Sequence, residues 1–224
     1  MNIEICIALV PEQAVSLALQ NASVTLAESN TNGASSSILQ LQGNDDRLSL
    51  APHMTLYQTS MPIASLDSAA DKVREWIKTR VGNPLHMDAC EISSNEFEGS
   101  TEIKYRPTDE IHHVQDAVVK IFNIARAGMT VEKNPAGLTL AEARFKTSGA
   151  HLTSLEEYGF PEVGPTVFNP HVTVSWHKGG VPDAGSLSAL KDLCAFSGLF
   201  NTLAIYSMGP QGSCPQRIWS CEMR

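Results

Sequence analysis

Two short segments of the sequence carry the same order of His and Thr. One is Pro52-His53-Met54-Thr55-Leu56, and the other, far along the chain, is Pro170-His171-Val172-Thr173-Val174. With seven histidines and fourteen threonines in 224 residues, fewer than one His-x-Thr is expected by chance. Residues two apart in a strand share a face, so each segment places an imidazole beside a hydroxyl while its apolar residues face the other way.

An imidazole beside a hydroxyl suits acid-base chemistry at a developing negative charge. A His side chain has a pKa of about 6.5, so two of them can hold opposite protonation states near neutral pH and act as acid and base. The two hydroxyls can donate to oxygens on which negative charge concentrates. The alternative is that both histidines are half-buried strand residues without a catalytic role. Because the motif is duplicated, we favour a catalytic set of His53, Thr55, His171 and Thr173.

Strand alternation nominates further residues for the same faces. Tyr57 and Thr59 are expected beside His53, and Ser175 and His177 beside His171. We take Tyr57, Ser175 and His177 as substrate-binding candidates, with Tyr57 best suited to stack on a base or ribose. Cations that could face a phosphate are Arg47, Arg144, Lys146 and Lys178.

Other histidines are given no catalytic role. His151-Leu152-Thr153 repeats the spacing, but Glu156 follows Thr153 at capping-box distance. We therefore expect a short helix that ends near Gly159. The pair His112-His113 is consecutive and cannot share a helix face, so it is interpreted as a solvated helix end.

Each motif is followed by a segment of helical period and then by a run of strand character. After His53 the helix is expected from 65 or 68 to about 80, with an apolar stripe from Leu66 to Ile77, and the strand over 85–93. After His171 the helix is expected over 186–196 and the strand over 202–208. The order strand, helix, strand is therefore duplicated.

The remaining segments complete an α+β pattern. Strands are expected over 4–10, 38–41, 48–58 and 101–105, and helices over 12–29 and 108–126, where Asp109 and Glu110 occupy the first turn. Residues 31–37 are interpreted as a loop, 127–168 as irregular with one or two short helices, and 203–208 with 217–223 as a closing hairpin.

Length and composition favour one domain over 1–224, with an irregular insertion at about 127–165. The 42% apolar content is enough for one substantial core. The N-terminus lacks a basic region, and its apolar run is too short for a signal peptide or a membrane span, which predicts a cytoplasmic protein without membrane contact. The net charge of −8 argues against a protein that coats nucleic acid, but a nucleotide or a single RNA end remains compatible.

The cysteines give no sign of a cross-linked or metal-bound framework. Their number is odd, and no CxxC spacing occurs, so we expect reduced thiols and no structural zinc. The five are Cys6, Cys90, Cys194, Cys214 and Cys221.

With the two Pro-His-x-Thr-apolar strands and the duplicated order, the chain resembles the 2H phosphoesterase superfamily, which includes 2′–5′ RNA ligase and cyclic phosphodiesterase-like proteins. The resemblance spans roughly residues 3 to 222, leaves about 127–165 unmatched, and is specific at the motifs. It implies two pseudo-symmetric lobes of antiparallel sheet with outer helices, and a groove between them across which the motifs face each other. His53, Thr55, His171 and Thr173 then form the active site.

The function expected from this resemblance is a metal-independent hydrolase acting on a 2′,3′-cyclic phosphate or a 2′–5′ linkage, with no cofactor and as a monomer. Ligase activity is implied by the family name alone. The acid and base roles of the two histidines stay open, as does the substrate: an RNA end, a mononucleotide, a 2′–5′ linkage or an ADP-ribose cyclic phosphate. A non-catalytic RNA- or nucleotide-binding module is the alternative, although it needs no pair of proton donors. Metal-dependent hydrolysis would need a ligand cluster such as H-E-x-x-H, which the sequence lacks.

Overall fold

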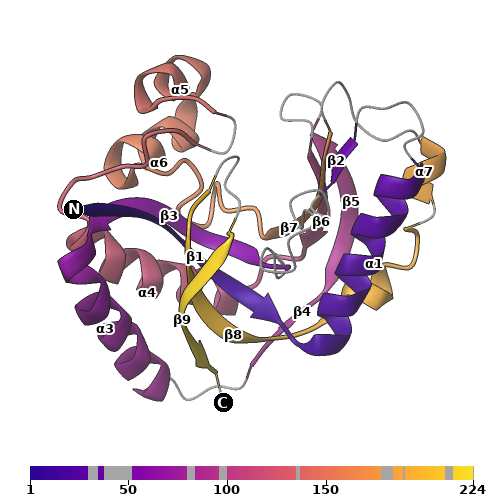
Figure 1. Cartoon of the computed structure of the whole chain (residues 1–224), viewed down its shortest axis with the longest axis horizontal. Helices are drawn as coiled ribbons and strands as arrows, with labels where there is room; N and C mark the ends of the chain where they lie inside the picture. The colour runs from indigo at the N-terminus through magenta and orange to yellow at the C-terminus, as the bar shows by residue number, and fades with distance from the viewer. Residues whose placement is uncertain are drawn as a thin grey trace.

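The computed structural model describes residues 1–29, 35–37, 52–79, 84–95, 100–134, 137–177, 184–188, 190–209 and 214–223. Over these residues the chain forms two antiparallel sheets with helices on their outer sides (Figure 1). The predicted α+β fold is confirmed.

The first sheet holds both ends of the described chain. Its strand order is β3-β1-β8-β4, and β9 pairs with β8. The predicted hairpin at the C-terminus is confirmed, since β8 and β9 pair antiparallel. The strands are β1 (Asn2–Pro11), β3 (Met54–Pro62), β4 (Leu85–Met87), β8 (Gly198–Ser207) and β9 (Gln216–Glu222).

The second sheet has the order β2-β7-β6-β5 over the described residues. Its strands are β2 (Ser35–Ser37), β5 (Ala89–Asn95), β6 (Ser100–Tyr105) and β7 (His171–His177). The loop expected over 31–37 is wrong for its last three residues, which pair with β7. The single strand expected over 85–93 is also wrong, because β4 pairs with β8 and β5 with β6. The chain passes between the sheets at Asp88. The strand expected over 38–41 lies outside the described residues.

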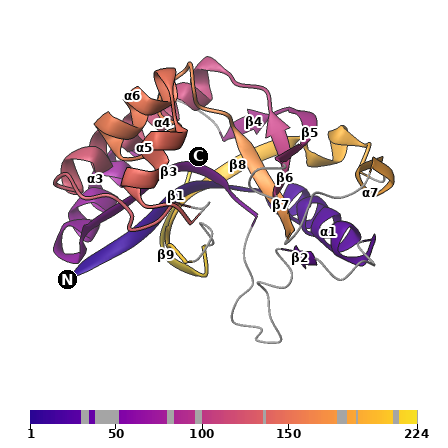
Figure 2. The ribbon, with the colours of Figure 1, turned by 90° about the horizontal axis from the view of Figure 1, so that it is seen from above.

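Two helices each follow a strand of one sheet and pack on the other sheet. α1 (Gln13–Ser29) follows β1 of the first sheet but packs on β7 and β2 of the second, while α4 (Asp109–Ala125) follows β6 of the second sheet and packs on β3 of the first. Figures 1 and 2 show α1 and α4 on opposite sides of the molecule. The other helical elements are η2 (Ile63–Ser65), α3 (Leu66–Thr79), α5 (Leu140–Lys146), α6 (Gly149–Tyr158), α7 (Ala184–Ser188) and η3 (Leu193–Phe196).

The helix expected over 186–196 is wrong in its extent. α7 ends at Ser188, residues 190–192 are not helical, and η3 begins at Leu193. Asp192 is the reason for this second start, because its carboxylate accepts a hydrogen bond from the amide of Cys194 and caps η3. The duplication is kept in space: β8, the last strand of the second copy, joins the first sheet although β7 lies in the second, and β5 of the first copy joins the second sheet although β3 lies in the first.

The predicted apolar stripes of α3 and α4 form much of the core. Leu66, Val73 and Ile77 of α3 are buried, as are Ile111 and Phe122 of α4. Thr108 caps α4 by accepting from the amide of Ile111, as its position in the sequence suggests. None of the described helices is long and apolar enough to cross a membrane.

Candidate active site

His53 lies immediately before β3, whereas Thr55 lies within the strand. In the described chain the strand expected over 48–58 begins at Met54. Pro52, just before it, has no backbone N–H to donate to a neighbouring strand. The His53 Nε2 atom is 3.3 Å from Cys214 Sγ, and the His53 ring lies 5.8 Å from that of Tyr206, centroid to centroid. The first imidazole is therefore held against β8 and the loop before β9.

His171 is the first residue of β7, and its orientation is set by the chain before it. The carbonyl of Pro170 accepts from the amide of Tyr105, 2.8 Å away, which fixes the entry to the strand. The His171 Nδ1 atom lies 2.8 Å from the carbonyl oxygen of Asn169. A carbonyl only accepts, so Nδ1 carries the proton and Nε2 is left for proton transfer.

The two motif strands come from different sheets but contact each other, β3 with β7. Each carries a bulge at the same place, one residue after the threonine. On β3, Thr55 pairs with Ala8 and Tyr57 with Ile7, so Leu56 has no partner in the register. On β7, Thr173 pairs with Glu102 and Ser175 with Thr101, so Val174 is skipped. The duplication seen in the sequence therefore extends to the backbone.

The bulges reverse the strand alternation after each threonine. Opposite residues of an antiparallel pair share a face, so Tyr57 lies on the face of Ile7 and Ser175 on that of Thr101, away from the motif threonines. Tyr57 is fully buried, and its hydroxyl donates to the carbonyl of Tyr158, 2.7 Å away. The Tyr57 side chain therefore lies in the core and not beside His53, where strand alternation predicts it. Thr59, opposite Ile5, faces the same core.

Ser175 is likewise fully buried on the core face, opposite Thr101. We therefore leave Tyr57 and Ser175 out of the proposed site. His177 belongs to β7, but its side chain lies outside what the structure describes.

Two cysteines that the sequence reasoning passed over lie beside the first motif. Cys6 of β1 shares the Thr55 face, with its Sγ 3.6 Å from Thr55 Oγ1. A hydrogen bond from Cys214 and the neighbouring His53 hold the pKa of the Cys6 thiol well below its ordinary value. The hydrogen bond with Cys6, together with burial, raises the pKa of Cys214. One ligand atom from each of Cys6, His53 and Cys214 lies within 4.8 Å of the others, so this trio is able to hold a metal ion.

The same face of the first sheet carries buried polar atoms with no hydrogen-bond partner among the described residues. They are the Gln58 Oε1 atom and the Tyr206 hydroxyl, both on residues opposite Cys6. Burial raises the pKa of Tyr206 to about 12, so the hydroxyl keeps its proton at neutral pH. Arg217 of β9 pairs with Tyr206 and is exposed, which puts a cation at the rim of this face.

Two carboxylates lie near the second motif. Glu102 is buried opposite Thr173 and accepts a hydrogen bond of 2.9 Å from the Ser100 hydroxyl. Glu162 lies within electrostatic reach of both Glu102 and His171. Burial and the Glu102 charge raise the pKa of Glu162, against the opposing effect of His171. The sequence held no signal for these two residues, because neither is near His171 in a motif.

The segment with the third His-x-Thr spacing, His151 to Thr153, is helical. His151 and Thr153 lie in α6, which ends at Gly159 in a left-handed conformation (φ 71°), so the expected helix and its end are confirmed. The capping box expected at Thr153 is wrong, because α6 begins four residues earlier at Gly149 and the Thr153 hydroxyl bonds back to the Gly149 carbonyl.

His112 also differs from expectation. It lies in the first turns of α4, as expected, but is partly buried, with its ring 5.9 Å from that of Phe168, centroid to centroid; the neighbouring His113 is exposed, as the interpretation required. Of the expected phosphate-facing cations, Arg144 and Lys146 are exposed in the last turn of α5. Arg47 and Lys178 lie outside the described residues.

No protein-family model matches the chain, and no curated protein matches it in sequence. Solved structures match it in fold. A crystal structure of a phosphoesterase is 9% identical, with 100% of this chain and 99% of that one covered and a TM-score of 0.51. E. coli LigT complexed with 3′-AMP is 7% identical, with 99% of this chain and 98% of that one covered and a TM-score of 0.51. The chain therefore has the fold of these phosphoesterase structures over its whole length.

Proposed function

We propose that the protein is a metal-independent phosphodiesterase that hydrolyses a 2′,3′-cyclic phosphate or a 2′–5′ linkage in a nucleotide or at an RNA end. One of His53 and His171 deprotonates the attacking water, and the other protonates the departing ribose oxygen. Thr55 and Thr173 donate to the non-bridging oxygens, where negative charge grows as the water attacks. The Asn169 carbonyl holds the His171 ring, and Glu162 lies within electrostatic reach of it.

The observation that carries this proposal is the duplicated backbone at the two motifs. The bulges at Leu56 and Val174 turn Tyr57 and Ser175 to the opposite face, while Thr55 and Thr173 keep the faces that they share with Ala8 and Glu102. Two such strands, one in each sheet and in contact, supply the two proton-transfer groups and two donors that the reaction needs. A nucleotide-binding module would have no use for two such pairs.

A small nucleotide is the proposed substrate class. Arg217, with Tyr206 and Gln58 beside the first motif, offers a cation and two polar groups for a phosphate and a ribose. One protein of this fold, E. coli LigT, has been crystallised with 3′-AMP, which supports a nucleotide of similar size. The net charge of −8 also favours short substrates over long RNA.

The test is incubation with 2′,3′-cyclic mononucleotides, cyclic-ended oligonucleotides and 2′–5′ dinucleotides in excess chelator. Hydrolysis of at least one class is expected, and it should be lost in His171→Ala. The matched control is His151→Ala, because His151 has the same His-x-Thr spacing but is exposed on α6. Tight nucleotide binding without turnover would instead identify a binding module, and activity that appears only with added metal would overturn the mechanism.

A further inference from the structure

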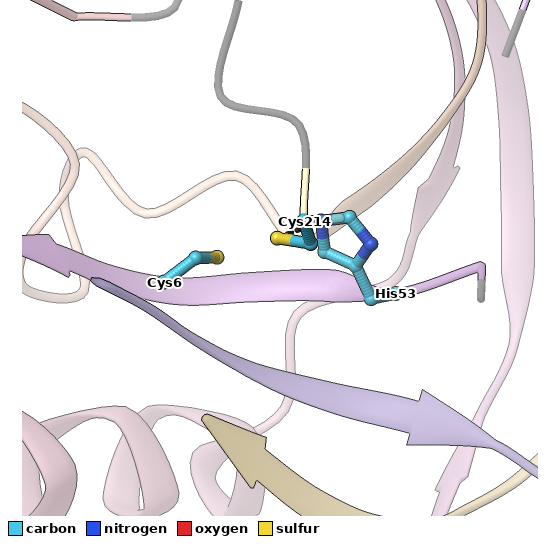
Figure 3. A group of neighbouring side chains, drawn as sticks. All are labelled: Cys6, His53 and Cys214. Atoms are coloured by element: carbon cyan, nitrogen blue, oxygen red, sulfur yellow. Dashed lines mark hydrogen bonds between the residues drawn. The ribbon is translucent and has the colours of Figure 1, made fainter. Parts of the chain in front are cut away.

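The side chains of Cys6, His53 and Cys214 converge from three separate parts of the chain. Figure 3 shows them pointing toward one another, from β1, from the residue before β3 and from the segment before β9. The three ligand atoms lie within 4.8 Å of one another, and His53 Nε2 and Cys214 Sγ are 3.3 Å apart. Both cysteines are buried and His53 is half-buried. The proposed hydrolysis uses the imidazole but has no role for the two thiols.

The spacing of these atoms suits a tetrahedral metal ion. Bonds of about 2.3 Å from zinc to sulfur and about 2.0–2.1 Å to nitrogen place neighbouring ligand atoms about 3.5–3.8 Å apart. The cluster therefore needs only small side-chain shifts to surround such an ion. Two sulfurs and one imidazole favour zinc over Mg²⁺ or Ca²⁺, which prefer oxygen ligands.

The surroundings also suit a metal site. The Thr55 hydroxyl is 3.6 Å from Cys6 Sγ and can donate to a zinc-bound thiolate. The buried Tyr206 hydroxyl and the Gln58 side-chain Oε1 atom, without partners among the described residues, lie on the face of Cys6 and add polar atoms to the surroundings of the cluster. With three protein ligands, the fourth position of a tetrahedral zinc stays open.

We propose that Cys6, His53 and Cys214 form a zinc site, and that Zn²⁺ bound there inhibits hydrolysis by occupying the His53 Nε2 atom. Binding converts both thiols to thiolates and releases their protons to solvent. The inhibitory half rests on the proposed function, because a nitrogen bonded to zinc can neither take nor give a proton. The binding half stands on the geometry alone.

Binding is tested with Zn²⁺ and Co²⁺ by calorimetry and absorption, with a phosphine reductant to keep the thiols reduced. All proteins carry Cys90→Ala and Cys194→Ala, which removes two exposed thiols. We expect one equivalent of zinc and a thiolate-to-cobalt charge-transfer band. Cys6→Ala and Cys214→Ala should each weaken binding by more than about 100-fold, beyond the ~10–100-fold typical of an outer partner. Cys221→Ala is the matched control and should bind as the parent does.

Binding that is equally tight in Cys6→Ala and Cys214→Ala, or absent in the parent, would overturn the site. Circular dichroism checks that each variant is folded. Because the two cysteines lie in different parts of the chain, either variant alone tests the site if the other does not fold. Excess Mg²⁺ should not displace the zinc.

Inhibition is tested as the ratio of turnover with one equivalent of zinc to turnover in chelator, for each variant against itself. The ratio should be about 0.1 or lower in the parent and near one in Cys6→Ala. Chelator added after zinc should restore the turnover of the parent. Zinc that raises turnover, or leaves it unchanged while bound, would overturn the inhibitory role. If the metal-free protein hydrolyses none of the substrates but still binds one zinc, the proposed function fails and the metal site stands.

Discussion

The side-chain amide of Gln115 donates a hydrogen bond of 3.1 Å to the carbonyl oxygen of Leu56, the bulge residue that follows Thr55. The same amide nitrogen donates to the Glu162 carbonyl at 2.7 Å, and the Gln115 carbonyl oxygen accepts from the amide of Gly164 at 3.1 Å. Gln115 is buried on α4. One side chain thus ties the first motif to the segment that leads to the second.

Replacement of Gln115 by Ala should lower the free energy of unfolding by about 2–3 kcal/mol, because it leaves buried backbone groups without partners. Urea denaturation measures this loss. The matched control is Asp116→Asn on the same helix, where an exposed ion pair with Lys120 is lost and the change should stay within about 0.5 kcal/mol. Equal losses in the two variants would show that the Gln115 network does not hold the bulge.

The conversion of Tyr57 to Phe distinguishes a core role from a substrate-binding role. It removes the hydroxyl that donates to the Tyr158 carbonyl, and the free energy of unfolding should fall by about 1 kcal/mol. Turnover and KM on the best cyclic substrate should change less than twofold, since the ring lies in the core. A large rise in KM with unchanged stability would return Tyr57 to the substrate site.

The sequence predicted the fold class, most element positions and the apolar stripes, because these depend on local period and composition. It also predicted that His171 and Thr173 share a strand face, and their partners Lys104 and Glu102 lie two residues apart on β6. It did not predict that Tyr57 and Ser175 turn away, because a bulge adds one residue to a strand without a change in composition. The Leu56 and Val174 positions carry ordinary strand residues, so nothing in the sequence marks them.

The cysteine cluster was missed for a different reason. Metal sites are found in sequences by short ligand spacings, whereas Cys6, His53 and Cys214 belong to three segments that only the sheet brings together. A weak signal exists in β1, where Cys6 and Ala8 alternate with Ile5 and Ile7. Small residues on one face of a buried strand leave space for other side chains to pack over that face. The Cys214 and His53 side chains pack there.

The stability of the protein should depend on pH through Glu162. Burial and Glu102 raise the pKa of Glu162 above its ordinary value of 4.5 in the folded state. The folded state therefore binds more protons than the unfolded state in this range, so the stability that this group contributes is present at low pH and lost as pH rises through the folded pKa. Glu162→Gln cannot ionise and should remove this loss. Unfolding free energies from below pH 4.5 to neutral pH should converge at low pH, with the variant more stable at neutral pH; parallel curves would contradict the assignment.

Arg217 should contribute to substrate affinity rather than to turnover. Arg217→Gln removes the exposed cation opposite Tyr206 and is expected to raise KM roughly tenfold, equivalent to about 1.4 kcal/mol, with little change in kcat. The matched control is Arg74→Gln. The Arg74 guanidinium lies 5.4 Å from the centroid of the Trp219 ring, and Trp219 pairs with Ile205 on the opposite face of the sheet from Arg217. Arg74→Gln therefore removes one positive charge from the other face. An equal rise in KM in both variants would point to net charge alone.

The division of proton transfer between His53 and His171 gives the sharpest prediction. His53→Ala and His171→Ala should each lower kcat by about 10²–10⁴-fold with the fold intact, because each removes one proton-transfer group. The double variant should lose less than the product of the two single losses, because the groups act in one step and the residual rate comes from binding and the hydroxyl donors. Thr55→Ala and Thr173→Ala should be milder, at about 3 kcal/mol for one lost donor to a developing charge. These values are measured as kcat in excess chelator, with circular dichroism and urea unfolding for each variant. If both single His variants are well folded and turn over the best substrate at near the parent rate, neither imidazole transfers the proton and the active site lies elsewhere.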